Sequence, residues 1–438
     1  MKEDLSNKKI LKFWLPLSAT WLMMSVEGPF LTALVARMAD PEFNLAAYGV
    51  AFALALIIES PVIMMMSASI ALVHDDFSFI KLRNFVYIVN ILITACMVVL
   101  IIPSVFYLFT IDLMNLPREV AELTHKAVVI LLPWPAAIGY RRFYQGIMIS
   151  SNATRRVAYG TVIRMGSMFL VAVLALSFFD LDGVVVGASA LTAGVIMEAL
   201  ASRIMAIKFV KKIREIGIKT ELPRLTYPEI LKFYYPLALT SFISLGVHPV
   251  VTFFMGQGRM PLESLAVLPV LNSFVFFFRS FGLSYQEVGI ALMGDNKNYS
   301  KLKNFAVVMA VSVVAGLGLI SFTPLAEIWF SDIAGLSPEL SRFSIFPLMI
   351  YTIFPATTVW ISFQRAILVY SRNTGPITFA TIMEVAGITL TLLITIKFFS
   401  LIGVVAAVIA FLVGRMAAII YLIPSFKREI RKNAELSS

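Results

Sequence analysis

The sequence predicts an all-α integral membrane protein with twelve transmembrane helices in two parallel six-helix bundles, related by a pseudo-two-fold axis along the membrane normal. Apolar residues make up 59% of the 438 residues and charged residues only 14%, with a mean hydropathy of +0.87. That composition requires a bilayer as solvent. The chain also matches itself without a gap at an offset of 220 residues. A repeat of half the chain indicates two copies of one large unit, which in a membrane protein is typical of a transporter.

The internal match extends over nearly the whole of both copies. Residues 10–13 recur at 230–233 as Ile-Leu-Lys-Phe, and residues 81–85 share four of their five residues with 301–305. Spaced prolines, aromatic residues and glycines match as well: Pro29 with Pro249, Pro41 with Pro261, Pro135 with Pro355, Phe143 with Phe363, Gly183 with Gly403 and Gly194 with Gly414.

Twelve apolar stretches are long enough to cross roughly 30 Å of hydrocarbon as helices. They lie at about 10–34, 46–73, 83–110, 120–149, 157–179, 183–208, 229–255, 262–292, 302–330, 338–368, 375–398 and 402–424. The chain then divides into an N-lobe (1–208), a cytoplasmic linker (209–228), a C-lobe (229–425) and a cytoplasmic tail (426–438). The linker alternates basic and apolar residues, which indicates either an amphipathic helix on the membrane surface or a solvated connection.

Lysine and arginine residues set the predicted orientation, because positive segments resist translocation. They concentrate in the termini, the linker and alternate loops, whereas the opposite loops hold few of them and several aspartates. We therefore expect both termini in the cytoplasm and the chain in the cytoplasmic (inner or plasma) membrane. This topology accounts for most of the net charge of +10, so nucleic acid is not an expected partner.

The sequence carries no motif for catalysis, a cofactor or a metal. It has no GxxxxGK phosphate loop, no HExxH and no run of histidines and cysteines at metal spacing. Cys96 is alone in a predicted span, which excludes an internal disulfide. No cleavable signal peptide is recognisable, because the first apolar stretch is too long and recurs at residue 230. We expect no enzyme activity, no cofactor and no metal.

Ionisable side chains inside the predicted spans are the candidates for function, because a charge at membrane depth is costly unless it faces water or a partner. They are Glu27, Glu59, Arg141, Arg142, Arg164, Glu198, His248, Arg279, Glu287, Arg365, Glu384 and Arg415. Glu59 falls on Arg279 in the second copy. The two would form either a gating salt bridge across the axis or separate structural pairs, each within its own half.

The fourth and tenth spans hold a polar group that includes Arg142, Gln145, Gln364 and Arg365, in which Arg365 falls on Gln145. The planar guanidinium of arginine can donate two hydrogen bonds to a carboxylate or phosphate, and side-chain amides can donate further hydrogen bonds to the same group. These four residues are therefore candidate substrate ligands. The alternative is an arginine whose side chain extends to the membrane interface, which suits Arg141 or Arg142 better than Arg365.

The first and seventh spans each carry a proline at mid-span, where a proline frees backbone carbonyls and permits bending. Pro29 and Pro249 are therefore predicted hinges. Glu27 is a candidate carrier of a coupling proton, and His248 a candidate anion ligand or pH sensor. The alternative for both is a buried polar residue that satisfies the broken helix.

Four segments carry a resemblance to a known family: 45–61, 236–254, 294–302 and 354–368. The chain resembles the multidrug/oligosaccharidyl-lipid/polysaccharide flippase superfamily (MATE-type fold), most of all the progressive ankylosis protein family. The resemblance implies export of small organic anions such as citrate, ATP or pyrophosphate. Multidrug members tend to carry acidic residues in the seventh, eighth or tenth helix, where this chain has His248, Arg279 and Arg365.

Three functions therefore stay open: export of small anions by alternating access, with transport secondary-active or facilitative; a MATE-type multidrug exporter or a flippase for lipid-linked oligosaccharides; and an integral membrane enzyme. A flippase should have spare hydrophobic helices for a polyprenyl tail, and a membrane prenyltransferase needs clustered aspartates for magnesium. Twelve spans leave no spare pair, and the spans hold no such aspartates. The expected partners are a small anionic substrate, membrane lipids and H⁺ or Na⁺ as coupling ion, with the chain a monomer.

Overall fold

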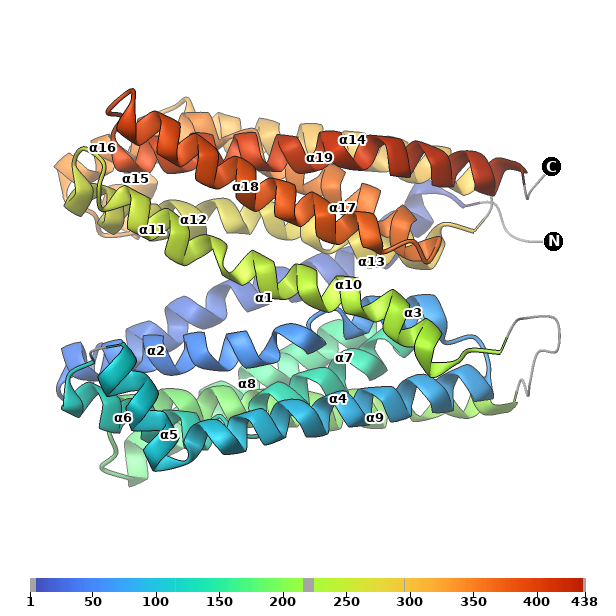
Figure 1. The fold of residues 1–438 in the computed structure, drawn as a ribbon, viewed down its shortest axis with the longest axis horizontal. Helices are drawn as coiled ribbons and strands as arrows, with labels where there is room; N and C mark the ends of the chain where they lie inside the picture. The colour runs from blue at the N-terminus through green and yellow to red at the C-terminus, as the bar shows by residue number, and fades with distance from the viewer. Residues whose placement is uncertain (1–4, 115, 216–223, 295, 436–438) are drawn as a thin grey trace. The chain divides into compact units, whose positions relative to one another are not determined.

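The computed structural model describes residues 5–114, 116–215, 224–294 and 296–435, and most of these residues are helical (Figure 1). The first copy contains α1 (Asn7–Val35), α2 (Pro41–Glu59), η1 (Ser60–Val62), α3 (Met65–Leu72), α4 (Asp76–Ile101), α5 (Pro103–Tyr107), η2 (Leu108–Leu113), α6 (Arg118–Ile130), α7 (Trp134–Ser150), α8 (Thr154–Phe178) and α9 (Gly183–Glu215). The second contains α10 (Tyr227–Leu245), α11 (Val247–Met255), α12 (Pro261–Leu283), α13 (Tyr285–Leu292), α14 (Asn296–Ser321), α15 (Leu325–Ile328), η3 (Trp329–Ile333), α16 (Pro338–Tyr351), α17 (Phe354–Tyr370), α18 (Gly375–Lys397) and α19 (Gly403–Glu435).

Ten helical stretches in the described ranges are long and apolar enough to cross a membrane. The other two of the twelve predicted spans, at about 10–34 and 120–149, are also helical. The 29-residue α1 is about 43 Å long at 1.5 Å per residue, and it occupies the repeat position of the span Tyr227–Met255. The pair α6 and α7 covers 118–150, which corresponds residue for residue to the span Pro338–Tyr370. The predicted all-α membrane fold is therefore confirmed.

The duplication is visible in the backbone as well as in the sequence. Asp40 and Met260 have left-handed φ angles of 47° and 52°, and Asn152 and Arg372 have φ angles of 59° and 57°. Each pair is separated by 220 residues. This conformation is unfavourable for side chains such as those of Met260 and Arg372, so its recurrence shows that the two copies share the same helix ends.

The helices form two compact units, each with its own apolar core. Unit 1 comprises Met1–Leu22 and Phe242–Ser438, and unit 2 comprises Met23–Ser241. These units differ from the lobes expected at 1–208 and 229–425, because the first part of α1 packs with the second copy and most of α10 with the first. The crossing points lie after Leu22 and after Ser241, one residue away from repeat-equivalent positions.

An aromatic side chain anchors the exchanged part of α1 in unit 1. Trp14 donates a hydrogen bond from Nε1 to the carbonyl oxygen of Phe281, at 3.1 Å. Its ring packs edge-on against Phe305, with ring centroids 5.8 Å apart. Phe281 lies two residues before the end of α12, where the helix is interrupted ahead of α13, so the bond occupies a carbonyl near a helix end.

The exchanged part of α10 is anchored in unit 2 by the repeat-equivalent contacts. The Tyr234 hydroxyl donates to the carbonyl oxygen of Pro61, and the Tyr234 ring packs edge-on against Phe85, with centroids 5.5 Å apart. Tyr234, Pro61 and Phe85 are the 220-residue counterparts of Trp14, Phe281 and Phe305. The exchange is therefore reciprocal and uses the same positions in both copies.

Tight helix pairs hold the charged residues of each unit in place. The pair α8 with α9 is in close contact in unit 2, and α18 with α19 in unit 1. A Cβ added at Gly194 would lie 2.3 Å from Met168, and one at Gly414 would lie 2.5 Å from the carbonyl oxygen of Glu384. These matching glycines allow the backbones to approach closely at the positions that carry Arg164 and Glu384.

The middle of the predicted linker (209–228) lies outside the described residues. Helix α9 continues beyond residue 208, the expected end of the sixth span, and reaches Glu215. Residues 216–223, which hold the middle of the predicted amphipathic segment, are among those not described.

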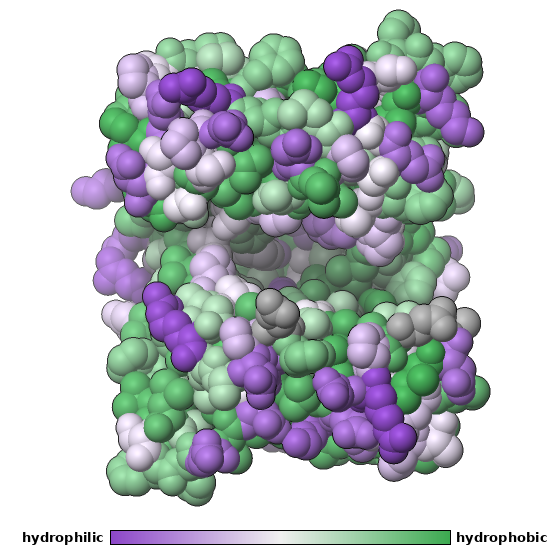
Figure 2. Space-filling model, turned by 90° about the vertical axis from the view of Figure 1, so that its left-hand side faces the viewer, coloured by the Kyte–Doolittle hydropathy of each residue, from purple (hydrophilic) through white to green (hydrophobic). Residues whose placement is uncertain are grey.

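On the end of the molecule shown in Figure 2, hydrophilic side chains gather among hydrophobic ones.

Candidate functional site

Unit 1 contains a cluster of charged side chains from four helices, which we call the arginine cluster: Arg279 of α12, Arg365 of α17, Glu384 of α18 and Arg415 of α19. Arg415 donates from Nε to Glu384 Oε1 at 2.8 Å, and both side chains are 12% exposed. Arg365 donates from Nη2 to the Thr381 hydroxyl at 3.2 Å. Arg415 is therefore compensated by a carboxylate, whereas Arg365 has a neutral partner.

Arg279 is held by an aromatic ring instead of a carboxylate. Its guanidinium lies 4.8 Å from the ring centroid of Phe354, and that of Arg415 lies 5.0 Å from the same ring. Cation–π contact attracts each guanidinium to the ring, although the two arginines repel each other. Among the ion pairs of the described residues, none joins Arg279 or Arg365 to a carboxylate within 4.0 Å.

The arginine cluster therefore carries an excess of positive charge. Three arginines stand against one carboxylate, which leaves two positive charges uncompensated. The Nε atoms of Arg279 and Arg365 are buried and have no hydrogen-bond partner. Both residues are nevertheless partly accessible, so a small anion that reaches them would meet unused donors in a fork geometry.

The equivalent region of unit 2 is electrically balanced, and we call it the paired network. Arg141 of α7 pairs with Glu198 of α9, and Arg164 of α8 pairs with Glu27 of α1. Arg164 also lies 3.6 Å from Glu198. Gln145 donates to Glu198 at 3.0 Å, so the Glu198 carboxylate, which is fully buried, binds several donors at once. Buried charges of this kind are tolerated because each has a partner.

Repeat positions explain how one framework yields two different charge states. Arg365 corresponds to Gln145, and Glu384 corresponds to Arg164. Thr381, which accepts from Arg365, corresponds to Thr161, whose hydroxyl lies 3.3 Å from Glu198. The same helix positions therefore hold a balanced network in one copy and an arginine excess in the other.

The structure separates the predicted ligands of the fourth and tenth spans. Gln145 is engaged by Glu198, and Gln364 donates to the carbonyl oxygen of Ile419 at 3.2 Å, which braces α17 against α19. Gln364 is fully buried. Of the four candidates from these spans, only Arg365 lies in the arginine cluster; Arg142 lies in unit 2, where its Nε is buried without a hydrogen-bond partner.

The predicted gating residues Glu59 and Arg279 belong to different units. Within unit 2, Glu59 is buried at the end of α2. The described ion pairs include none at Glu59 within 4.0 Å. The gate across the axis stays a prediction.

The two predicted proline hinges differ. The second copy is interrupted at Gly246, three residues before Pro249, where α10 ends and α11 begins. In the first copy α1 runs through Pro29 as one helix. There the Thr32 hydroxyl lies 3.0 Å from the Gly28 carbonyl oxygen and 3.2 Å from that of Pro29. His248, the second residue of α11, is exposed and belongs to unit 1, as does Arg279.

Sequence reasoning named Arg415 and Glu384 among the ionisable side chains of the spans without giving either a place in a binding site, and it did not consider Phe354. Their ion pair is present, but Arg415 also shares the Phe354 ring with Arg279. Phe354 stands at the repeat position of Trp134. A large aromatic residue at the same position of both copies is what ordinary core packing would give. Only the fold shows that the guanidiniums of Arg279 and Arg415 lie over the Phe354 ring.

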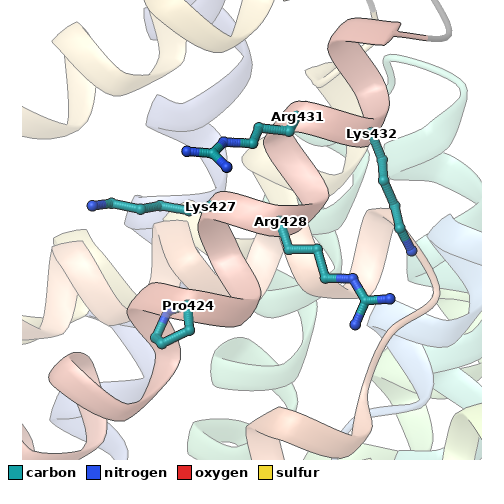
Figure 3. A pocket seen from close by; sticks show the side chains of 5 residues that line it. All are labelled: Pro424, Lys427, Arg428, Arg431 and Lys432. Atoms are coloured by element: carbon teal, nitrogen blue, oxygen red, sulfur yellow. The ribbon is translucent and has the colours of Figure 1, made fainter.

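A second basic feature lies at the end of α19. Figure 3 shows a pocket lined by Pro424, Lys427, Arg428, Arg431 and Lys432. Lys427 and Arg431 point to one side of the helix, and Arg428 and Lys432 point to the other. This surface is open, and its residues 427–432 fall in the basic tail that the sequence predicts at the cytoplasmic end.

Among the described residues no group of three His, Cys, Asp or Glu side chains is placed to hold a metal ion.

Comparisons with known proteins rest on structure. No protein-family model matches the sequence, and no curated protein sequence matches it. A multidrug resistance MATE family transporter of the MOP superfamily, solved in an outward-facing conformation, is 17% identical; the match covers 97% of this chain and 96% of that one, with a TM-score of 0.76. A eukaryotic MATE transporter is 13% identical over 98% of both chains, with a TM-score of 0.72.

A third solved structure is a MOP superfamily transporter from Pyrococcus furiosus, described as having a binding pocket of reverse polarity that suggests a different function. It is 18% identical over 97% of this chain and 96% of that one, with a TM-score of 0.73. These structures do not test the narrower resemblance to the progressive ankylosis family. What they show, together with the long apolar helices and the backbone repeat, is that this integral membrane chain has the MATE-type fold.

Proposed function

We propose that this protein is a membrane transporter that exports small anions of the citrate, nucleotide or pyrophosphate type by alternating access of its two halves. The MATE-type fold supports the transporter function. The excess of positive charge in the arginine cluster supports an anionic cargo. That excess is the single observation that carries the proposal.

Uncompensated charge in a membrane protein requires an explanation. Removing an arginine from water costs several kcal/mol unless a carboxylate or another acceptor replaces the lost hydration. In unit 2 the paired network meets that requirement with two carboxylates, those of Glu27 and Glu198, whereas Arg279 and Arg365 receive only a ring face and a hydroxyl. A carboxylate or phosphate group that accepts from both arginines would complete the arginine cluster.

The residues of the arginine cluster then have distinct roles. Arg279 and Arg365 bind the anionic groups of the substrate. Phe354 holds Arg279 and Arg415 at a fixed separation, because both guanidiniums lie on its ring. Glu384 neutralises Arg415 and keeps the site from binding its cargo too tightly for release. Glu27 and Glu59 in unit 2 remain the proposed carriers of a coupling H⁺, and transport driven by Na⁺ or without coupling gives the same architecture.

The test uses purified protein in proteoliposomes, with labelled citrate, ATP and pyrophosphate compared with an organic cation, each with and without a proton gradient. We expect transport of a multivalent anion and its reduction by at least about tenfold in Arg365→Ala and Arg279→Ala, each of which removes one charged hydrogen bond worth about 1.5–3 kcal/mol. Arg118→Ala is the matched control, because the Arg118 side chain is 83% exposed at the start of α6 and its ion pair is with Glu122.

Multidrug export is the second candidate, and one observation favours it. The first of the solved structures above is described as a multidrug resistance transporter. Under this function the organic cation would be transported, and Glu27→Gln would abolish its transport while Arg279→Ala and Arg365→Ala would leave it intact. That pattern, with no transport of any tested anion, would replace anion export by cation export.

A further inference from the structure

A group of tyrosines and arginines in unit 2 takes no part in the paired network. We call it the tyrosine–arginine cluster: Arg83 and Tyr87 of α4, Tyr140 and Tyr144 of α7, and Arg203 of α9. The three helices are neighbours, with α7 in contact with both α4 and α9 and a smaller contact between α4 and α9 (Figure 1). Residues far apart in the sequence therefore meet on one side of unit 2.

The members of this cluster form a continuous chain of contacts. The Arg83 guanidinium lies 5.8 Å from the centroid of the Tyr87 ring. Tyr87 stacks on Tyr140, with centroids 6.3 Å apart and planes 9° from parallel. Tyr140 meets Tyr144 edge-on at 4.9 Å, and Arg203 lies 5.0 Å from the Tyr144 centroid. Three tyrosines thus connect two guanidiniums that come from different helices.

Neither arginine of the cluster is neutralised by a carboxylate. Arg83 donates from Nη2 to Asn84 Oδ1 at 3.1 Å, and its buried Nε has no partner. The ion pairs of the described residues include none at Arg83 or Arg203 within 4.0 Å. Both side chains are only partly buried. The cluster therefore offers two positive charges, with free donors, at an accessible surface.

The depth of the cluster corresponds to the headgroup region of a bilayer. Arg83 is seven residues, or about 10 Å, inside α4, and Tyr144 is six residues, or about 9 Å, before the end of α7. Deeper along the same helices, the surface is apolar and exposed: Ile91 is 68% exposed on α4, and Leu200 is 53% exposed on α9. Apolar side chains with that exposure face acyl chains in a membrane protein.

We infer that the tyrosine–arginine cluster binds one anionic phospholipid of the leaflet at which α4 begins, the cytoplasmic leaflet in the predicted topology. The lipid phosphate accepts hydrogen bonds from Arg83 and Arg203, the glycerol region lies against the accessible Tyr87 and Tyr140, and the acyl chains run along Ile91 and Leu200. Basic sites between helices at this depth suit lipids that carry net negative charge. A zwitterionic lipid would add an ammonium beside two arginines, so the site selects against it.

The second copy lacks this cluster, although the fold repeats. The positions that correspond to its five members are Lys303, Val307, Trp360, Gln364 and Ile423. A single basic residue without tyrosines remains there, and Lys303 is exposed. The inference therefore predicts one selective lipid per chain, and it does not depend on what the transporter carries.

The experiment measures bound lipid on the delipidated full-length protein by native mass spectrometry, with phosphatidylglycerol, phosphatidylcholine and soluble glycerol phosphate as separate probes. We expect one tightly bound phosphatidylglycerol, at least about tenfold weaker phosphatidylcholine, and no binding of glycerol phosphate alone, because the acyl chains contribute to the site. Equal binding of the two lipids, or full binding of glycerol phosphate, would overturn the inference without any variant.

The variants locate the lipid on the protein. Arg83→Gln together with Arg203→Gln should weaken phosphatidylglycerol binding by at least about tenfold, since each arginine near an anionic headgroup contributes on the order of 1 kcal/mol. Lys303→Gln, at the repeat position of Arg83, is the matched control and should leave binding unchanged. Arg203→Lys keeps the charge and should retain part of the affinity. Unaltered binding in a folded double glutamine variant, judged by its size-exclusion profile, would place the lipid elsewhere.

Discussion

At the residue scale, the proposed anion export depends on which arginines have a carboxylate partner. Glu384 is the one carboxylate of the arginine cluster, and it accepts from Arg415 at 2.8 Å. Glu384→Gln should therefore raise the uncompensated charge from two to three and tighten the binding of a multivalent anion several-fold. It should also slow turnover, because a tighter site releases its cargo less readily. Equilibrium binding and initial transport rates in proteoliposomes measure the two effects separately.

The same substitution should destabilise the protein. Removing one partner of a largely buried ion pair costs about 3–5 kcal/mol, because the remaining charge is left without compensation. We expect the thermal midpoint in detergent to fall for Glu384→Gln and to recover when a bound anion is added. Glu122→Gln is the control, since the Glu122 side chain is 51% exposed and pairs with Arg118 in the first turns of α6. A midpoint that an anion does not restore would separate Glu384 from the binding site.

Residue-level prediction from the sequence was limited by distance along the chain. Intramembrane charge alone identified Arg279 and Arg365, because any charged residue in an apolar span attracts attention. Their common neighbour Phe354 is 75 residues from Arg279 and could not be recognised, since an aromatic residue in an apolar span carries no signal of its own. Gln145 was predicted as a ligand because it aligns with Arg365, yet Glu198, 53 residues later, occupies it.

At the element scale, the exchanged parts of α1 and α10 connect the two units. Any movement of one unit against the other must be accommodated where these helices cross from unit to unit, near Leu22 and Ser241. The bonds from Trp14 to Phe281 and from Tyr234 to Pro61 fix the exchanged parts. The sequence could not predict this exchange, because both copies carry the same apolar pattern and either unit offers α1 an apolar surface.

Removing the Tyr234 hydroxyl should weaken one of these anchors with little other change. Tyr234→Phe keeps the ring on Phe85 and loses one hydrogen bond, worth about 1 kcal/mol. We expect a lower thermal midpoint and a faster turnover at unchanged substrate affinity, because the state that contains the bond is less stable. Trp14→Phe should act in the same direction, and the two changes should add, since the bonds lie in different units.

Tyr235→Phe is the control for this pair, because Tyr235 is the next residue and is 60% exposed. It loses the same hydroxyl at a position that makes no described anchor. If Tyr235→Phe changes turnover as much as Tyr234→Phe does, the effect belongs to the membrane-facing surface of α10. If substrate affinity falls together with turnover in Tyr234→Phe, the bond supports the binding site and is not an anchor of the exchanged segment.

At the scale of the whole molecule, the sequence repeat predicted the architecture and the structure revealed its asymmetry. A 220-residue self-match requires two similar helical halves, and it held down to the left-handed φ angles of Asp40 and Met260. Charge is the property that the duplication did not preserve, because side chains at one position can be exchanged without changing the helix. The balanced paired network and the positive arginine cluster arose on one framework in this way, so the two halves can take different roles.

Coupling between the halves leads to the last prediction. Glu59 and Arg279 occupy equivalent positions, and an ion pair between them would be broken when an anionic substrate engages Arg279, which frees Glu59 to exchange a proton. Glu59→Gln should then leave anion binding intact or tighter and flatten the pH dependence of transport. The double swap Glu59→Arg with Arg279→Glu should transport more than either single variant. The competing possibility lies within unit 2, which also contains Arg142, whose Nε is buried without a hydrogen-bond partner. If Glu59 acts only inside its own unit, Arg142→Gln should reproduce the effect of Glu59→Gln, and the double swap should transport no better than the worse single variant. That result would exclude the pair of Glu59 and Arg279 as a gate. Glu27, which is paired with Arg164, would then be the carboxylate to test for proton coupling.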